Sequence, residues 1–99
     1  MVINKLVYEF EWDKGNIDKN LIKHKVRDNE AEEAFLDNKK VTFKDKLHSG
    51  SEHRLRILGK TKKGRLLFIV FTTRKRKIRI ISARDINRKE VSLYNEKTT

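Results

Sequence analysis

The sequence contains no cysteine and no proline, and it has only four glycines among 99 residues. The absence of cysteine excludes a disulfide framework and a thiolate zinc site, and it suits a reducing compartment. Without proline, the turns must be formed by glycine, asparagine, aspartate and lysine. Hydrophobic burial and ordinary hydrogen bonds therefore have to hold the fold together.

Long hydrophobic runs are also absent. The longest run, residues 66–71, has six residues, whereas a membrane-spanning helix needs about 20. The first residues lack the apolar segment of a secretory signal. We therefore expect a cytoplasmic protein, and the length predicts one domain over residues 1–99.

Acidic residues are outnumbered and unevenly placed. The chain has 25 lysines and arginines against 14 aspartates and glutamates, a formal net charge of +11. Residues 1–37 carry six basic and nine acidic side chains, whereas residues 38–99 carry nineteen and five, a net +14. A field of this size attracts a polyanion, so the charge favours nucleic acid as the partner. The alternatives are an acidic protein partner alone, or a charge that serves only solubility.

The N-terminal third is predicted to form a strand and two helices. Alternating apolar residues favour a strand over residues 7–12. A short helix is expected over residues 19–25, with Asp18 as its cap and with Leu21 and Ile22 buried.

The second helix should begin after Asn29, because Glu32 lies three residues further on, as in a capping box. Its buried stripe is predicted to consist of Ala31, Ala34 and Phe35.

The basic part of the chain changes to the period of strands. The turns between these strands are expected at 62–64, where Gly64 can adopt a positive φ, and at 74–77. A last helix over residues 88–95 should be capped by Asn87 with Glu90. The expected strands are residues 41–44, 53–60, 65–73 and 78–83, the third of them covered on both faces.

This order predicts an α+β fold with a small antiparallel sheet, two N-terminal helices and one C-terminal helix. The short turns after residue 40 are typical of a meander, and the helices should cover one face and leave a polar, concave face opposite.

The usual catalytic motifs are not found. His24, His48 and His53 do not have the spacing of metal ligands. No serine lies in a strand-turn-helix elbow, and the isolated glycines form no phosphate loop. We therefore expect no metal and no cofactor.

Arginines on successive strands are the strongest candidates for chemistry. Arginine has a planar fork that binds phosphate with two hydrogen bonds and can stabilise additional charge on it. The alternative is that they are ordinary solvent-facing residues. Arg79 and Arg84 are five positions apart, so a regular strand would place them on opposite faces unless it bends after Ser82. The predicted catalytic arginines are Arg54, Arg74, Arg79 and Arg84.

Three further residues are supporting candidates. His24 could act as a base or donate to phosphate, although a packing role is about as plausible. Glu52 could be a base or only an ion-pair partner of Arg54. Tyr94 could be a general acid or stack on a nucleobase, or it could pack against the sheet. Additional RNA contacts are predicted for Lys23, Arg56, Arg65, Arg76 and Lys77.

Several motifs occur together in the order of a known family. They are Trp12-Asp13; Asn20 with Lys23-His24; Ala34-Phe35 with Asp37; Glu52 with Arg54; Gly59; Gly64-Arg65 with Leu67; Thr72 with Arg74; Arg79-Ile80-Ile81-Ser82-Ala83-Arg84; Glu90; and Tyr94. With these motifs the chain resembles the BrnT family of toxins, the partners of BrnA antitoxins, over nearly its whole length. The run of residues 79–84 is the most specific of them.

The resemblance implies a RelE-like fold and a metal-independent endoribonuclease that arrests translation. It also implies a BrnA-like antitoxin with a ribbon-helix-helix domain, through which the complex would bind its own promoter DNA. Attack by the 2′-hydroxyl of the RNA itself would need no protein nucleophile. A non-enzymatic nucleic-acid-binding module is the alternative, and a subunit whose basic face serves only an acidic protein is a third hypothesis.

Overall fold

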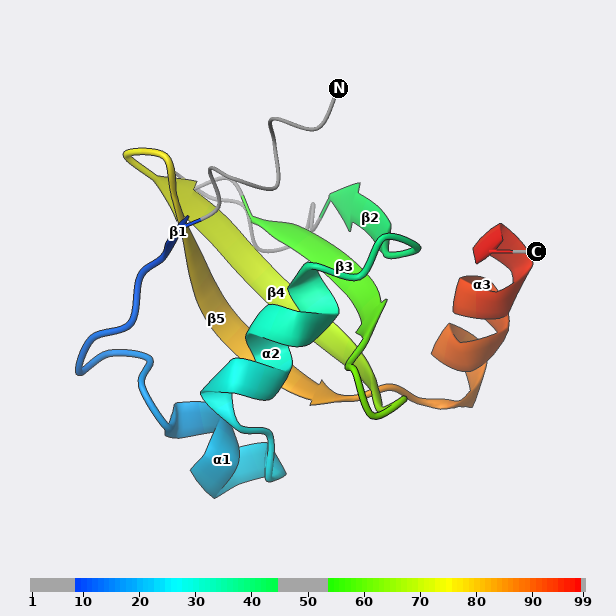
Figure 1. Ribbon diagram of the computed structural model, residues 1–99, viewed down its shortest axis with the longest axis horizontal. Helices are drawn as coiled ribbons and strands as arrows, with labels where there is room; N and C mark the ends of the chain where they lie inside the picture. The colour runs from blue at the N-terminus through cyan, green and yellow to red at the C-terminus, as the bar shows by residue number, and fades with distance from the viewer. Residues whose placement is uncertain (1–8, 45–53, 99) are drawn as a thin grey trace.

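The computed structural model describes residues 9–44 and 54–98, which form an α+β fold of five strands and three helices (Figure 1). This class agrees with the prediction. No helix in these two segments is long and apolar enough to cross a membrane. In chain order the elements are β1 (Glu9–Phe10), α1 (Lys19–His24), α2 (Asp28–Phe35), β2 (Val41–Lys44), β3 (Leu55–Lys60), β4 (Leu66–Arg74), β5 (Lys77–Asp85) and α3 (Arg88–Thr98).

The strands form one sheet in the order β1-β5-β4-β3-β2. Strands β2 to β5 are the predicted antiparallel meander. Strand β1 departs from the prediction of an antiparallel sheet, because it lies parallel to β5 and pairs Glu9 with Lys77 and Phe10 with Ile78. A parallel pair needs a long connection, and the rest of the sheet with α1 and α2 supplies it here.

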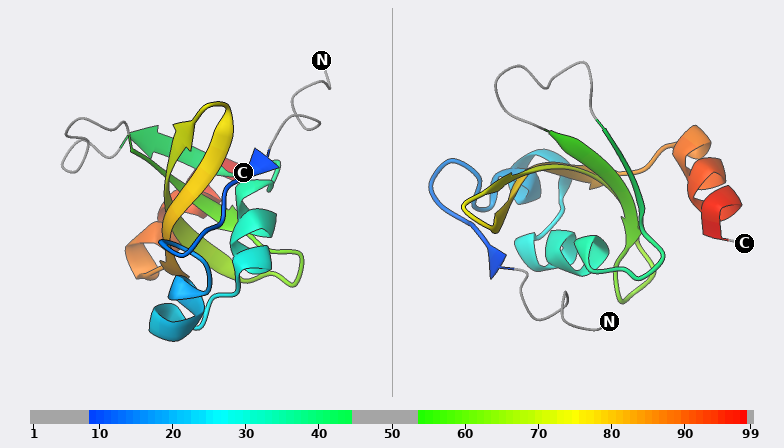
Figure 2. Two further views of the ribbon diagram at one scale, coloured as in Figure 1. Left: turned by 90° about the vertical axis from the view of Figure 1, so that its left-hand side faces the viewer. Right: turned by 90° about the horizontal axis from the view of Figure 1, so that it is seen from above.

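The sheet curves around α2, and α3 lies outside this curve, near β3 (Figure 2). The face away from α2 is therefore not the concave face that we expected. We call this outer surface the open face.

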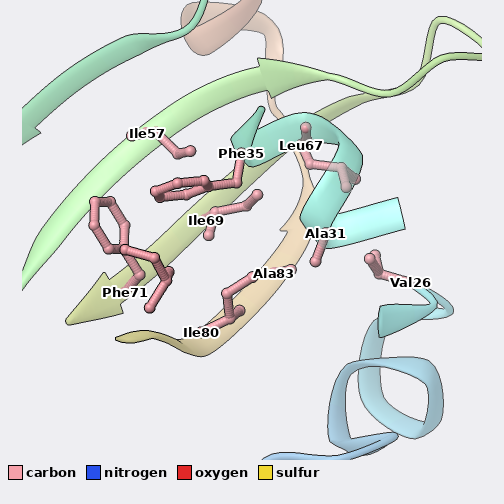
Figure 3. Close-up of a cluster of buried hydrophobic side chains, with 11 residues drawn as sticks. Val26, Ala31, Phe35, Ile57, Leu67, Ile69, Phe71, Ile80 and Ala83 are labelled. Atoms are coloured by element: carbon pink, nitrogen blue, oxygen red, sulfur yellow. The ribbon is translucent and has the colours of Figure 1, made fainter. Parts of the chain in front are cut away.

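The core lies between α2 and the inner face of the sheet (Figure 3). The predicted stripe of α2 is buried, and Phe35 meets Phe71 edge-on with ring centroids 4.9 Å apart. A Cβ atom at Gly59 would clash with the carbonyl oxygen of Ala34, so glycine lets α2 contact β3 directly. The buried strand residues of this cluster are Ile57, Leu67, Ile69, Phe71, Ile78, Ile80 and Ala83.

Strand β4 was expected to be covered on both faces, but only one face is fully buried. Leu67, Ile69 and Phe71 are buried toward α2, whereas Phe68 and Val70 are half-buried on the open face. Helix α2 packs against β4 on the inner side, whereas α3, on the outer side, lies near β3.

Helix α1 corrects two expectations. Leu21 is 38% and Ile22 is 83% exposed, so neither is a core residue. The buried side chain of this helix is Asn20, whose Oδ1 accepts a hydrogen bond from the Ala83 N–H at 3.0 Å. Asp18 occupies the N-cap position but makes no side-chain cap.

Helix α2 begins earlier than predicted. Arg27, not Asn29, is its N-cap residue, and the Arg27 N–H donates to Glu30 Oε1 at 2.9 Å. Arg27 and Asn29 each have a glutamate three residues later, Glu30 and Glu32. The burial of Val26 favours the earlier of these two N-caps.

The predicted turns and the last cap are present. Gly64 has a φ of 90°, and the β4–β5 hairpin turns through Lys75 and Arg76, with φ of 49° and 70°. At α3, the Glu90 N–H donates to Asn87 Oδ1 and the Asn87 N–H donates to Glu90 Oε1, each at 2.9 Å.

Candidate functional site

A β-bulge decides which arginines share a face. Val70 pairs with Ser82 but Phe71 pairs with Ile80, so Ile81 is an extra residue in β5. This extra residue inverts the alternation of side chains along the strand. As a result, Arg79, opposite Thr72, and Arg84, opposite Phe68, both belong to the open face.

Three of the predicted catalytic arginines line one hollow on this face. It has a volume of about 180 Å³ and is more suited to a phosphate group than to a larger ligand. We call it the arginine pocket. Its lining residues are Gly15, Asn16, Lys19, Arg54, Arg74, Arg79, Ile80 and Ile81.

Arg79 is held by carboxylates. Its guanidinium donates to Asp13 at 2.8 and 3.1 Å and to Glu11 at 3.1 Å, and the side chain is only 14% exposed. The hydrogen bonds from Arg79 and from the Gly15 N–H lower the pKa of Asp13. Arg79 therefore fastens the segment after β1 to β5 and forms a wall of the pocket, while much of its charge is already compensated.

The connection from β1 to α1 is further fixed by Asn16, which is buried. Its Nδ2 donates to the carbonyl oxygens of Glu11 and Ile80, and its Oδ1 accepts from the Asp13 N–H. This arrangement brings Lys19 into the pocket lining. Lys19 is not among the residues predicted from the sequence, where its only signal is the pair of flanking asparagines, Asn16 and Asn20.

A second group on the open face surrounds Phe68. The Arg84 guanidinium lies over the Phe68 ring at 4.2 Å from its centroid, and the Arg56 guanidinium lies at 5.9 Å. Glu90 binds both terminal nitrogens of Arg84, at 3.0 and 2.9 Å. Partial burial would by itself raise the pKa of Glu90, but the bonds from Arg84 and the Asn87 N–H lower it overall. The alternation of β4 could have placed Phe68 on this face.

Arg65 does not lie on the open face with these arginines. It pairs with Asp85 at 2.7 Å and with Glu30 at 3.2 Å, and it donates to the Lys25 carbonyl oxygen at 2.8 Å. Arg65 thus joins the α1–α2 connection to the end of β5. Its predicted RNA contact has no support from this geometry.

His24 and Lys23 lie exposed at the end of α1. The pKa of Asp85 is lowered mainly by its hydrogen bond from Arg65 and to a smaller degree by the charge of His24. His24 is therefore near the end of β5, whereas Arg79 in the arginine pocket is near its beginning.

Tyr94 is also separate from the arginines. Its buried hydroxyl donates to Asp37 Oδ2 at 2.6 Å, and the Lys60 ammonium lies 5.7 Å from the ring centroid. Burial, followed by the bond to Asp37, raises the pKa of Tyr94 to about 12. In this position the tyrosine attaches α3 to the end of β3.

The remaining predicted residues are at the hairpin or outside the described part. Arg76 is exposed at the tip of the β4–β5 turn, and the Lys77 Nζ atom lies 3.8 Å from Glu9 Oε2. Glu52, with His48 and His53, is outside the described residues. Within residues 9–44 and 54–98, no three histidine, aspartate or glutamate side chains are grouped so that they could hold a metal ion.

Comparison with known families agrees with the resemblance seen in the motifs. A small α+β protein with arginines gathered on one sheet face is suited to bind a polyanion. The family model described as "Ribonuclease toxin, BrnT, of type II toxin-antitoxin system" matches residues 12–90. The chain therefore belongs to this family of ribonuclease toxins, whose substrate is RNA and whose partner is a protein antitoxin. A comparison with curated proteins gave no match.

Proposed function

We propose that this toxin is an endoribonuclease that cleaves RNA at the open face without a metal ion and so arrests translation in the cytoplasm. The observation that supports this most directly is the arginine pocket, in which Arg54, Arg74 and Lys19 meet. The net +14 of residues 38–99 would concentrate RNA at this surface.

The proposed reaction is a transfer within the RNA. The 2′-oxygen forms a bond to the adjacent phosphorus, and the bond from phosphorus to the 5′-oxygen breaks. The products are a 2′,3′-cyclic phosphate and a 5′-hydroxyl. A base takes the proton of the 2′-hydroxyl, and an acid supplies a proton to the leaving 5′-oxygen.

Arg54 and Arg74 would act by binding the phosphate. Negative charge grows on the non-bridging oxygens as the 2′-oxygen attacks, and fixed guanidinium groups stabilise it. Arg79 would hold the pocket in shape through Asp13 and Glu11.

The proton-transfer groups are less strongly supported. Lys19 is the lysine that lines the pocket and is our candidate acid. Glu52, two residues before Arg54 in the sequence, is our candidate base. His24 and Tyr94 are weaker candidates, because their contacts are with other parts of the molecule.

Cleavage of RNA in the presence of a chelator tests this proposal. Arg54→Ala and Arg74→Ala should each lower the cleavage rate by about 10²- to 10³-fold. Lysine at either position should rescue only in part, because it keeps the charge but loses the planar fork.

Lys63→Ala is the matched control, since it removes one positive charge from the exposed 62–64 turn. Circular dichroism establishes that each variant is folded. Full cleavage by the Arg54 and Arg74 variants, or loss of wild-type cleavage in chelator, would contradict the proposal.

We also propose that the antitoxin is BrnA-like, carries a ribbon-helix-helix domain and covers the arginine pocket. Ile17, Leu21 and Ile22 form an exposed apolar patch, and Ile17 directly follows the pocket residue Asn16. A partner with acidic and apolar side chains could bind both surfaces at once. Co-expression with the neighbouring reading frame should restore growth, and the purified pair should bind its promoter DNA. Separate elution of the two proteins at moderate salt would argue against this partner.

A further inference from the structure

Arg84, like Arg79, has a guanidinium whose charge is already paired with a carboxylate. Its two terminal nitrogens are bound by both oxygens of Glu90, and one of them also donates to the Asp85 carbonyl oxygen at 2.9 Å. The lowered pKa of Glu90 keeps this partner ionised at neutral pH. A guanidinium that is neutralised in this way has little charge left for a phosphate.

The guanidinium of Arg84 is held between neighbours, and its side chain remains partly exposed. One side of the guanidinium lies over the Phe68 ring at 4.2 Å, and the Arg84 side chain is 36% exposed, whereas Glu90 is 16% exposed. The carboxylate and the ring together fix the plane of the group. Guanidinium planes supported in this manner are surfaces on which unpaired RNA bases stack.

We propose that Arg84, supported by Phe68 and Glu90, is a stacking platform for a nucleobase of the RNA substrate. This inference rests on the proposed function, and it assigns to Arg84 a binding role in place of direct charge stabilisation. Purines should be favoured, because their two rings cover more of the platform than one ring does.

The position of the platform fits a strand that enters the arginine pocket. Arg84 is opposite Phe68, and the pocket residue Arg79 is opposite Thr72, four residues further along β4. At about 3.3 Å per residue, the Arg84–Phe68 pair and the Arg79–Thr72 pair are about 13 Å apart along the strands. This is about four nucleotides of a stacked strand, or fewer of an extended one. Both pairs are on the open face, so one RNA strand can reach both.

The test separates stacking from phosphate binding by its dependence on salt. The double variant Arg84→Gln/Glu90→Gln leaves the net charge unchanged, and glutamine at position 90 can retain the capping box of α3. Arg74→Gln is the comparison for a phosphate contact. Binding is measured by titration with a short 2′-O-methyl RNA, which cannot be cleaved by attack of its 2′-oxygen, and with an abasic strand of the same length.

The double variant should bind the 2′-O-methyl RNA about five- to a hundredfold more weakly than wild type, the loss typical of one stacked base. Its slope of log K against log salt should equal that of wild type. Arg74→Gln should make the slope shallower by about 0.7, the contribution of one phosphate on a single strand. On the abasic strand, the double variant and wild type should bind equally.

A shallower slope for the double variant would mean that Arg84 contacts phosphate, and equal affinity for the 2′-O-methyl RNA would mean that the platform binds no base. Either result overturns the proposal. Phe68→Leu provides a second test that leaves Arg84 and Glu90 in place, and it should also weaken binding without changing the slope. None of these measurements requires cleavage, so they remain decisive if the proposed reaction is wrong.

Discussion

Replacing Tyr94 with phenylalanine distinguishes a structural tyrosine from a catalytic one. The change removes only the hydroxyl that donates to Asp37 at 2.6 Å. Hydrogen bonds to charged groups contribute about 1.5–3 kcal/mol. Asp37 is partly exposed and keeps the N–H groups of Lys39 and Lys60 as donors, so we expect the lower end of this range, about 1.5–2 kcal/mol. For a chain of this size that is a fall in Tm of about 5–15 °C.

The pH dependence of this loss follows from the two pKa values. The pKa of Tyr94 is raised from 10.0 to about 12, so the bond stabilises the fold fully below pH 10 and is lost as the pH rises through 12. Burial tends to raise the pKa of Asp37, but its hydrogen bonds lower it below 3.8, so the stabilisation is present above pH 4 and is lost at lower pH. The difference in stability between wild type and Tyr94→Phe should therefore be constant between about pH 5 and 9 and shrink in acid.

Thermal unfolding at several pH values and the RNA-cleavage assay are measured on the same preparations. We expect the variant to be less stable and to cleave RNA at the wild-type rate below its melting temperature. Unchanged stability together with a large loss of cleavage would refute this reasoning and return Tyr94 to the catalytic residues.

Three further predictions concern packing, RNA binding and the antitoxin. Gly59→Ala should lower the free energy of unfolding by about 3 kcal/mol, because the new Cβ would meet the α2 backbone. Gly64→Ala has open space but a φ of 90°, and it should lower the free energy of unfolding by only about 1–2 kcal/mol. Equal losses of the two variants in denaturant titrations would contradict this prediction. With four to six phosphate contacts, RNA binding should have a slope of log K against log salt of about −3 to −4, and a flat titration would disprove an electrostatic interface. Ile22→Asp should preserve cleavage but weaken antitoxin binding by about tenfold or more. Leu36→Asp, at an exposed leucine outside the apolar patch, should leave antitoxin binding unchanged. Equal binding by both variants would exclude the apolar patch as part of the antitoxin interface.

The elements of the fold could be predicted because their signals are local. Strand alternation, the helical stripe of α2 and the Asn87–Glu90 cap depend on residues close together in the sequence. The errors occurred where distant contacts compete with local pattern. Leu21 and Ile22 follow the pattern of a core helix, but Asn20 is the residue that meets β5 and is buried. The parallel pairing of β1 likewise depends on the whole sheet and has no local signal.

The sequence by itself determined the α+β class, the antiparallel meander, the basic C-terminal part and the family, because periodicity, composition and motifs record these directly. Only the tertiary structure decided which arginines share a face of the sheet. One additional residue in β5, Ile81, inverts the alternation and brings Arg79 and Arg84 to one face. Carboxylates from other segments then pair with Arg79 and Arg84, so the charge of these two guanidinium groups is already compensated.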